Sequence, residues 1–251
     1  MQQRENTFHD HFEITSYMVD EKQRLSPVFI FYLMQDIAVR HCAITGASWE
    51  FMHEHQLFWA LSRTEVEIVR RPNWHEQIEV TTWEKKPNYL IQPRDHQIDT
   101  LNGETLVRST SNWVLLDAEG KPRTLEGFEH LLHPQLDLHA IERPAARLRE
   151  SAVSDEQQPL FKPVLFSHLD MNHHVNNASY VLWAIDDFDK EFLRSHELTS
   201  LSLNFIQQMR GDDSYGIYRK EIAPSQFLSS IVSMNEKVEV CRVRTTWKEE
   251  E

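Results

Sequence analysis

Apolar residues recur along the first part of the chain in the spacing of a strand followed by a long helix. Alternation predicts a strand over Phe12–Val19. Beyond Ser26, apolar positions recur every three or four residues up to Cys42, which is the pattern of an amphipathic helix. Ser26 is a favoured helix cap, Pro27 suits the first helical position, and Gly46 suits the end of a helix. The pattern therefore predicts one strand and then one long helix.

Strict alternation between residues 57 and 117 then predicts four antiparallel strands. Asn102-Gly103 is the residue pair of a tight hairpin turn and joins two of them. From residue 118 to residue 159 the alternation disappears, and proline, glutamate, arginine and serine dominate. A segment of this length is expected to cross the outside of the fold. The pattern predicts an N-terminal domain of residues 1–117, a linker of residues 118–159 and a C-terminal domain of residues 160–251.

The C-terminal domain repeats the order of the first. A short strand ends near Phe166, a helix follows, and alternation predicts four further strands. Asp20 aligns with Asp170 at an offset of 150 residues, and the same offset aligns the capping residues Ser26 and Asn176. Chance similarity between two amphipathic helices is the alternative. The matching order of elements favours a duplicated α+β fold in which each half wraps an antiparallel sheet around a helix.

The segment that leads into the second helix concentrates polar side chains. Asp170, Asn172 and His174 alternate, so in an extended chain all three would project to one side. Asn176 and Asn177 are helix caps, and the backbone N–H groups at a helix N-terminus suit a developing oxyanion. A base, an orienting amide and an oxyanion site in one segment indicate a hydrolase centre. The alternative is a turn that caps a helix through local side-chain bonds.

The composition of the chain argues against several classes of binding partner. The sequence has 251 residues, with 26 lysines and arginines against 39 aspartates and glutamates, and the net charge of −13 disfavours nucleic acid. Its six glycines form no G-x-G-x-x-G or phosphate-binding loop, and we expect no cofactor. No apolar run approaches the roughly 20 residues of a bilayer span, and the polar N-terminus shows no secretory signal. Cys42 and Cys241 have no ligand spacing, so we expect reduced thiols in a cytoplasmic protein without a membrane partner.

Histidines and acids near the hydrolase segment raise the question of a metal site. His168, Asp170, His173 and His174 are all possible ligand types. Adjacent histidines in an extended segment point apart, which opposes a shared site. We therefore expect no metal here.

Several segments, in order, resemble one family. Residues 170–177 resemble the D-x-N-x-H-V-N-N segment of acyl-[acyl carrier protein] thioesterases, which are the plant fatty-acid chain-terminating enzymes and their bacterial relatives. Three earlier segments resemble the W-V-L-S-R, R-Y-P-x-W and V-x-T-W segments of that family: Trp59–Arg63, Arg71–Trp74 and Val80–Trp83. The resemblance runs from about Phe12 to Val243. It implies a tandem hotdog fold and hydrolysis of the thioester of fatty acyl-[acyl carrier protein] in fatty acid biosynthesis.

The chain departs from the family at one point. Plant members carry a glutamate and a cysteine side by side in a later strand, where this sequence has Gln208 and Met209. A thioether forms no thiolate, so a cysteine nucleophile is excluded at this position. Gln208 takes no proton as a base, but it can orient water or substrate. The chemistry is then expected to come from the polar segment before the second helix.

The catalytic roles of the polar residues before the second helix can be assigned in more than one way. Either His174 or Asp170 is the general base, and Asn172 orients its partner or the attacking water. Asp170 could instead attack directly and form an anhydride. The backbone N–H groups near Asn176 and Asn177 would receive the oxyanion.

The contacts with the acyl carrier protein and the activity of the protein also have more than one explanation. Lys85, Lys86, Arg70, Arg71 and Arg94 could contact an acidic carrier protein, although a solvated charged face is the commoner role of such residues. An acyl-CoA thioesterase on the same fold is a second hypothesis. A non-hydrolytic acyl-binding protein is a third, because the glutamate and cysteine are missing. As a tandem fold already pairs two hotdogs, either a monomer or a homodimer is expected.

Overall fold

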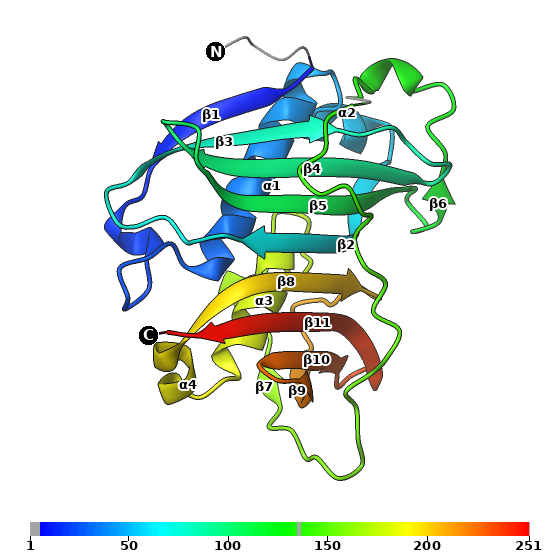
Figure 1. The fold of residues 1–251 in the computed structure, drawn as a ribbon. Helices are drawn as coiled ribbons and strands as arrows, with labels where there is room; N and C mark the ends of the chain where they lie inside the picture. Colours follow the sequence, from blue (N-terminus) through cyan, green and yellow to red (C-terminus); the bar gives the residue numbers. More distant parts are fainter. Residues whose placement is uncertain (1–5, 135–136, 251) are drawn as a thin grey trace. The chain divides into compact units, whose positions relative to one another are not determined.

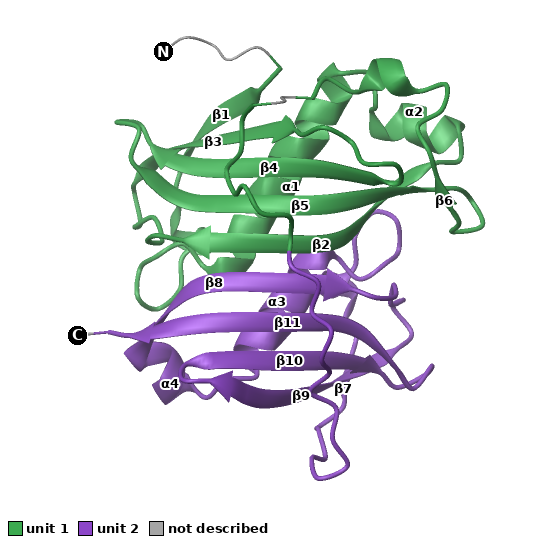
Figure 2. Ribbon diagram, turned by 45° about the vertical axis from the view of Figure 1, so that its right-hand side comes forward, with its two compact units in different colours: residues 1–145 green, residues 146–251 purple. Residues whose placement is uncertain are grey.

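The chain folds into two compact units. The computed structural model describes residues 6–134 and 137–250; the start of the polar N-terminus, two linker positions and residue 251 lie outside the described residues. The units are Met1–Ala145 and Ala146–Glu251, shown in separate colours in Figure 2. The division falls inside the segment predicted as a linker. Each unit holds a helix and an antiparallel sheet of its own.

The sheet of the first unit is antiparallel throughout, with the order β1-β3-β4-β5-β2 and a short β6 paired to β5. Its strands are β1 (Phe8–Glu13), β2 (Phe58–Ile68), β3 (Gln77–Glu84), β4 (Ile91–Thr100), β5 (Thr105–Leu116) and β6 (Pro122–Arg123). The four predicted strands are thus β2 to β5, and the predicted hairpin joins β4 to β5. Gly103 has φ of 85° in this turn, a conformation that glycine adopts without strain.

Helix α1 (Pro27–Ile44) lies against one face of this sheet (Figure 1). Ser26 and Pro27 begin the helix as predicted, and its buried residues follow the predicted periodicity: Ile30, Phe31, Leu33, Met34, Ile37, Ala38 and His41. The predicted strand Phe12–Val19 is wrong in its bounds. The strand β1 ends at Glu13, and Ser16–Met18 forms a 3₁₀ helix (η1). A short second helix, α2 (Trp49–Glu54), was not predicted.

Among the described residues, α1 is also the one helix long and apolar enough by composition to cross a membrane. The expectation that no apolar run comes near that length was therefore too strict. Half of its 18 residues are buried inside the protein. The apolar face of α1 is thus used to cover the sheet of the first unit.

The second unit has the same plan with a shorter helix. Its sheet is antiparallel, with the order β8-β11-β10-β9-β7. Its elements are β7 (Lys162–Pro163), η3 (Phe166–His168), α3 (Asn177–Asp186), α4 (Lys190–Ser195), β8 (His196–Phe205), β9 (Ser214–Ala223), β10 (Gln226–Ser233) and β11 (Val238–Glu249). The four predicted strands are present as β8 to β11. The helix α4 was not predicted.

Aromatic side chains pack α3 against the sheet of the second unit. The Trp183 ring stacks on Tyr215 with centroids 3.7 Å apart, and only 2% of Trp183 is exposed. Trp83 in the first unit is equally buried. Core packing, the commoner role for a tryptophan, therefore holds for these two residues. Trp74, in contrast, is 41% exposed.

The predicted repeat is confirmed by hydrogen bonds at the offset of 150 residues. In each unit a 3₁₀ helix, a tight loop and the start of the long helix follow in the same order. Three backbone hydrogen bonds of the first loop recur in the second. The bond from Asp20 N to Arg24 O matches that from Asp170 N to His174 O, and the bond from Gln23 N to Asp20 O matches that from His173 N to Asp170 O. The bond from Ser26 N to Met18 O matches that from Asn176 N to His168 O. Gln23 and His173 both have positive φ, 58° and 62°. The two loops therefore share one backbone conformation.

The linker is tied down along the first unit. Trp83 Nε1 donates to Leu138 O at 3.0 Å, and Ala140 N donates to Asp95 Oδ2 at 2.8 Å. Arg94, the residue before Asp95 on β4, contacts His41 of α1. Because successive strand residues point to opposite faces, the linker at residues 138–140 lies on the face away from α1.

The linker is tied down in the second unit as well. There Asn204 Oδ1 accepts from Leu148 N, and its Nδ2 donates to Ala146 O, each at 2.8 Å. Arg242 Nη1 donates to Leu148 O at 2.9 Å. These bonds satisfy backbone groups of a segment that has little secondary structure of its own.

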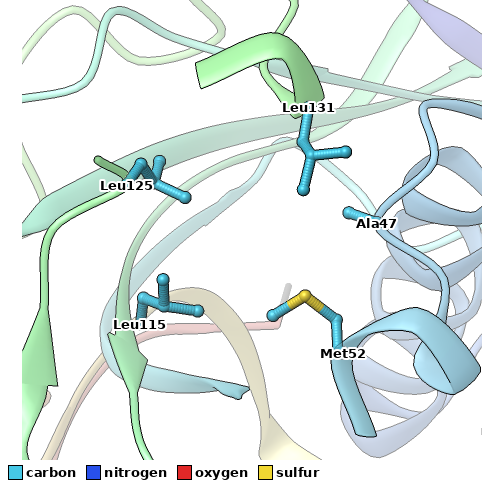
Figure 3. Packing of buried hydrophobic residues seen from close by; sticks show 5 residues of the cluster. All are labelled: Ala47, Met52, Leu115, Leu125 and Leu131. Carbon is cyan, nitrogen blue, oxygen red and sulfur yellow. The ribbon is translucent and has the colours of Figure 1, made fainter. Parts of the chain in front are cut away.

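A separate apolar cluster closes the end of the first unit beside α2. In Figure 3 the side chains of Ala47, Met52, Leu115, Leu125 and Leu131 point toward a common centre. Leu125 and Leu131 come from the linker segment, and Leu115 comes from β5. The cluster therefore attaches the start of the linker to the core.

Replacing Leu115 with alanine is expected to lower the free energy of unfolding by about 2–5 kcal/mol. Leu115 is 1% exposed, so the substitution removes apolar contacts and leaves a cavity that its neighbours fill only in part. Urea unfolding of the two proteins measures the difference. Leu101→Ala is the matched control, because Leu101 is 46% exposed and should change stability by no more than about 0.5 kcal/mol. Equal losses for the two variants would contradict the role of the cluster.

Candidate active site

The three predicted catalytic residues lie on the tight loop between η3 and α3. Asp170 N donates to His174 O at 2.8 Å, and His173 N donates to Asp170 O at 3.1 Å. Leu169 and Val175 pair as an antiparallel bridge at the base of the loop. The segment is thus a closed turn and not an extended chain. The prediction that alternation alone places the three side chains on one side is wrong for this reason.

The carboxylate of Asp170 organises the loop from inside. Its Oδ1 accepts from Asn172 N at 2.8 Å and from His174 N at 3.2 Å. Asp170 and His174 are half-buried, whereas Asn172 is exposed. The aspartate therefore fixes the backbone of both residues whose side chains carry the other polar groups. The local turn considered as an alternative is present, and the polar side chains stand on it.

Of the two oxyanion donors predicted at the start of α3, one is already used by a backbone hydrogen bond. Asn176 is the helix cap, and its Oδ1 accepts from Ala178 N at 2.9 Å. The N–H of Asn176 already donates to His168 O at 2.9 Å, so the prediction that it receives an oxyanion is corrected. Asn177 N–H begins the helix, and no described residue accepts a hydrogen bond from it. Asn177 therefore stays the predicted oxyanion donor.

His168 has a structural role. Its Nδ1 accepts from Leu165 N at 3.0 Å, and its ring lies edge-on to Trp183 with centroids 5.1 Å apart. Burial lowers the pKa of His168, which keeps the ring neutral. Within residues 6–134 and 137–250, no group of three histidine, cysteine, aspartate or glutamate side chains is placed to hold a metal ion.

Gln208 and Met209 lie beside the loop. Met209 is 2% exposed, and its carbonyl oxygen accepts from Val175 N at 3.0 Å. Gln208 is exposed. Burial raises the pKa of the Cys241 thiol well above its usual range and raises that of Cys42 as well, so neither cysteine is an activated nucleophile.

Most of the basic residues considered for the carrier protein are engaged elsewhere. Arg71 and Arg94 are each 6% exposed. Lys85 lies 3.3 Å from Asp95, with 10% of its side chain exposed, and Arg70 binds Glu76 at 2.8 Å. Arg71, Arg94 and Lys85 are too buried to contact a carrier protein, whereas Arg70 keeps 37% of its side chain exposed beside Glu76. Lys86, in contrast, is exposed.

One functional contrast was missed in the sequence. The Arg71 guanidinium pairs with Oδ2 of Asp20, the counterpart of Asp170 in the first unit. The available signal was the position of Arg71 just before Pro72, which corresponds to that of Gln208 just before Met209. A partner 51 residues away in the sequence is not visible from local pattern.

Each unit packs a helix on an antiparallel sheet, and together the two units define the tandem hotdog fold. Two solved structures share it. An acyl-ACP thioesterase from Bacteroides thetaiotaomicron superposes with a TM-score of 0.85 at 20% identity, covering 99% of this chain and all of that one. The 12:0-ACP thioesterase from Umbellularia californica gives a TM-score of 0.84 at 23% identity, covering all of both chains.

Two family models then match the sequence. The acyl-ACP thioesterase N-terminal domain matches residues 5–124, and the acyl-ACP thioesterase C-terminal domain matches residues 151–249. The chain belongs to the acyl-ACP thioesterase family. The resemblance noted from single motifs is thereby confirmed.

Curated relatives are similar across most of this chain. A chloroplastic palmitoyl-acyl carrier protein thioesterase from Cuphea hookeriana is 27% identical over 91% of the chain. A chloroplastic oleoyl-acyl carrier protein thioesterase from Arabidopsis thaliana is 24% identical, also over 91%. The chain spans 55% of the length of the first relative and 67% of the second.

Proposed function

We propose that this protein hydrolyses the thioester of fatty acyl-[acyl carrier protein] and releases the free fatty acid. One observation carries the proposal. Both units contain the same hydrogen-bonded loop, but only the second carries Asn172 and His174, where the first has Lys22 and Arg24. Membership of the acyl-ACP thioesterase family supports the choice of substrate.

His174 is the proposed general base. Asp170 Oδ1 is used by two backbone N–H groups, and Asp20 Oδ1 makes the same bonds in the copy without the asparagine and histidine. That bonding is therefore part of the scaffold. A neutral imidazole can accept a proton from water, and the negative charge of Asp170 would stabilise the imidazolium that results.

The reaction follows from these roles. His174 accepts a proton from water as the water oxygen bonds to the thioester carbonyl carbon. The carbonyl electrons move to oxygen, and the N–H of Asn177 stabilises that oxyanion. When the oxyanion collapses, the carbon–sulfur bond breaks and the sulfur leaves with the proton from His174. Asn172 is proposed to orient the attacking water.

The test uses purified protein with acyl chains of several lengths on acyl carrier protein, and follows release of the carrier thiol. Thiol release above the uncatalysed blank is expected. The same chains on coenzyme A separate the alternative acyl-CoA thioesterase, since a larger kcat/KM on coenzyme A would favour it. No release from either carrier would overturn the proposed function.

A non-hydrolytic acyl-binding role is the second candidate. Gln208 and Met209, in place of the glutamate and cysteine of plant members, favour it. Tight binding of an acyl chain without turnover, at protein concentrations above those of substrate, would establish this role.

We also predict a cytoplasmic location and either a monomeric or a homodimeric protein. A cytoplasmic location is tested by cell fractionation. A monomer or a homodimer is tested by light scattering.

A further inference from the structure

The two loops differ in the residue that approaches the aspartate from the neighbouring segment. Main-chain contacts align these segments at an offset of 137 residues. The matching contacts are Leu25 N to Pro72 O (2.7 Å) and Val175 N to Met209 O (3.0 Å), Ile14 N to Glu76 O (3.0 Å) and Val164 N to Asp213 O (2.9 Å), and the bridges Arg24 with Asn73 and His174 with Arg210. Gln208 therefore occupies in the second unit the place that Arg71 occupies in the first.

In the first unit that place neutralises the aspartate. The Arg71 side chain is 5% exposed, and its Nη1 binds Asp20 Oδ2 and also Leu25 O at 3.3 Å. Asp20 Oδ1 accepts from Lys22 N at 2.9 Å and from Arg24 N at 3.4 Å. Both carboxylate oxygens of Asp20 are thus occupied, one of them by a buried cation.

In the second unit, hydrogen bonds from the described residues reach only one carboxylate oxygen of Asp170. Oδ1 of Asp170 binds the N–H groups of Asn172 and His174, and no residue in the described part of the chain donates a hydrogen bond to its Oδ2. Gln208 carries no charge, and its side chain is exposed. The negative charge of Asp170 is therefore not paired with a cation from this position.

We propose that the residue at position 208 determines whether the loop aspartate takes part in the reaction. The neutral Gln208 leaves the charge of Asp170 to stabilise the imidazolium of His174, whereas an arginine there would hold Asp170 in an ion pair, as Arg71 holds Asp20. Position 208 thus acts through the absence of a cation, and the inference rests on the proposed hydrolysis.

Gln208→Arg is the direct test. It is expected to lower kcat by about 10²-fold, while KM for acyl-[acyl carrier protein] stays within about twofold, because the loss falls on a charge that forms only during the reaction. The exposed position should accept arginine without loss of thermal stability. Gln208→Met, neutral and of similar length, is expected to keep kcat within about threefold.

Gln207→Arg is the matched charge control. Gln207 is also exposed, but its side chain binds Glu236, so an arginine there would pair with Glu236 instead of Asp170. It is expected to retain nearly all of the wild-type kcat. An equal loss in Gln207→Arg would show a general charge effect and overturn the proposal.

A double-mutant cycle with Asp170→Asn separates this inference from the proposed function. If the arginine acts through Asp170, adding Gln208→Arg to Asp170→Asn lowers kcat no further. Multiplying losses would overturn the role of position 208. If Gln208→Arg kept full turnover while His174→Ala was inactive, the role of position 208 would be overturned and the proposed function would stand. No turnover by the wild-type protein would overturn both.

Discussion

Replacing His174 with alanine is expected to lower kcat for acyl-[acyl carrier protein] hydrolysis by about 10²–10⁴-fold, with little change in KM. The loss follows because the substitution removes the group that takes a proton from water and later returns one to the leaving sulfur. The loop itself should persist, since its bonds use the backbone of residue 174 and the carboxylate of Asp170. Steady-state rates and circular dichroism of the same preparations measure the two effects separately.

His173 offers a matched control for this experiment. It is adjacent to His174 and exposed, and its φ of 62° suits asparagine, which tolerates the left-handed region. His173→Asn is expected to keep kcat within about threefold. Wild-type rates in His174→Ala, or an equal loss in His173→Asn, would remove His174 from the proposed mechanism.

Mild acid is expected to destabilise the first unit through two buried histidines. His41 and His96 are each 4% exposed. Burial and the nearby Arg94 guanidinium lower the pKa of His41 to about 4 and that of His96 to about 3, from a usual 6.5. Arg94 Nη1 lies 3.0 Å from His41 Nδ1, where it donates to the neutral ring and would repel a protonated one.

The difference in proton binding between the folded and unfolded chain decides how the free energy of unfolding changes with pH. Below pH 6.5 the unfolded chain protonates both histidines, while the folded chain keeps them neutral until about pH 4 and about pH 3. The unfolded state therefore binds more protons, and the free energy of unfolding falls as the pH falls. Each histidine contributes about 1.4 kcal/mol per pH unit well inside this window, so the pair contributes about 3 kcal/mol per unit.

Urea unfolding at several pH values between 7.5 and 5 measures this slope. His96→Leu should remove about half of the histidine contribution. Asp95 acts in the opposite direction, because burial raises its pKa, but it is present in both proteins and cancels in the comparison. His173→Asn, at an exposed position, should keep the wild-type slope. An unchanged slope in His96→Leu would contradict the assignment.

The sequence predicted those features that depend on local pattern. The periodicity and caps of α1, the hairpin at Asn102-Gly103 and the four strands that follow each long helix all appear in the structure. The repeat was visible because backbone-defined turns retain aspartate and helix-capping residues. The bounds of β1 were wrong because alternation continues through residues that the chain uses for a 3₁₀ turn.

The features that were missed depend on contacts between distant residues. Arg71 and Arg94 look like surface cations in the sequence, but each meets a carboxylate from another segment, Asp20 and Glu84. The N–H of Asn176 seemed available until the structure paired it with His168 O. The helix α4 is only six residues long, too short for periodicity to reveal.

The shared backbone of the two loops shows which residues the turn requires and which can change without altering it. Since Asp20 and Asp170 close the same turn, the residues two and four positions later can change from Asn172 and His174 to lysine and arginine with every main-chain bond retained. The first unit therefore shows that this loop conformation is compatible with lysine and arginine at those two positions. Substituting lysine and arginine at positions 172 and 174, instead of alanine, is expected to abolish the proposed hydrolysis while keeping the loop folded, so that a bound substrate could be trapped intact.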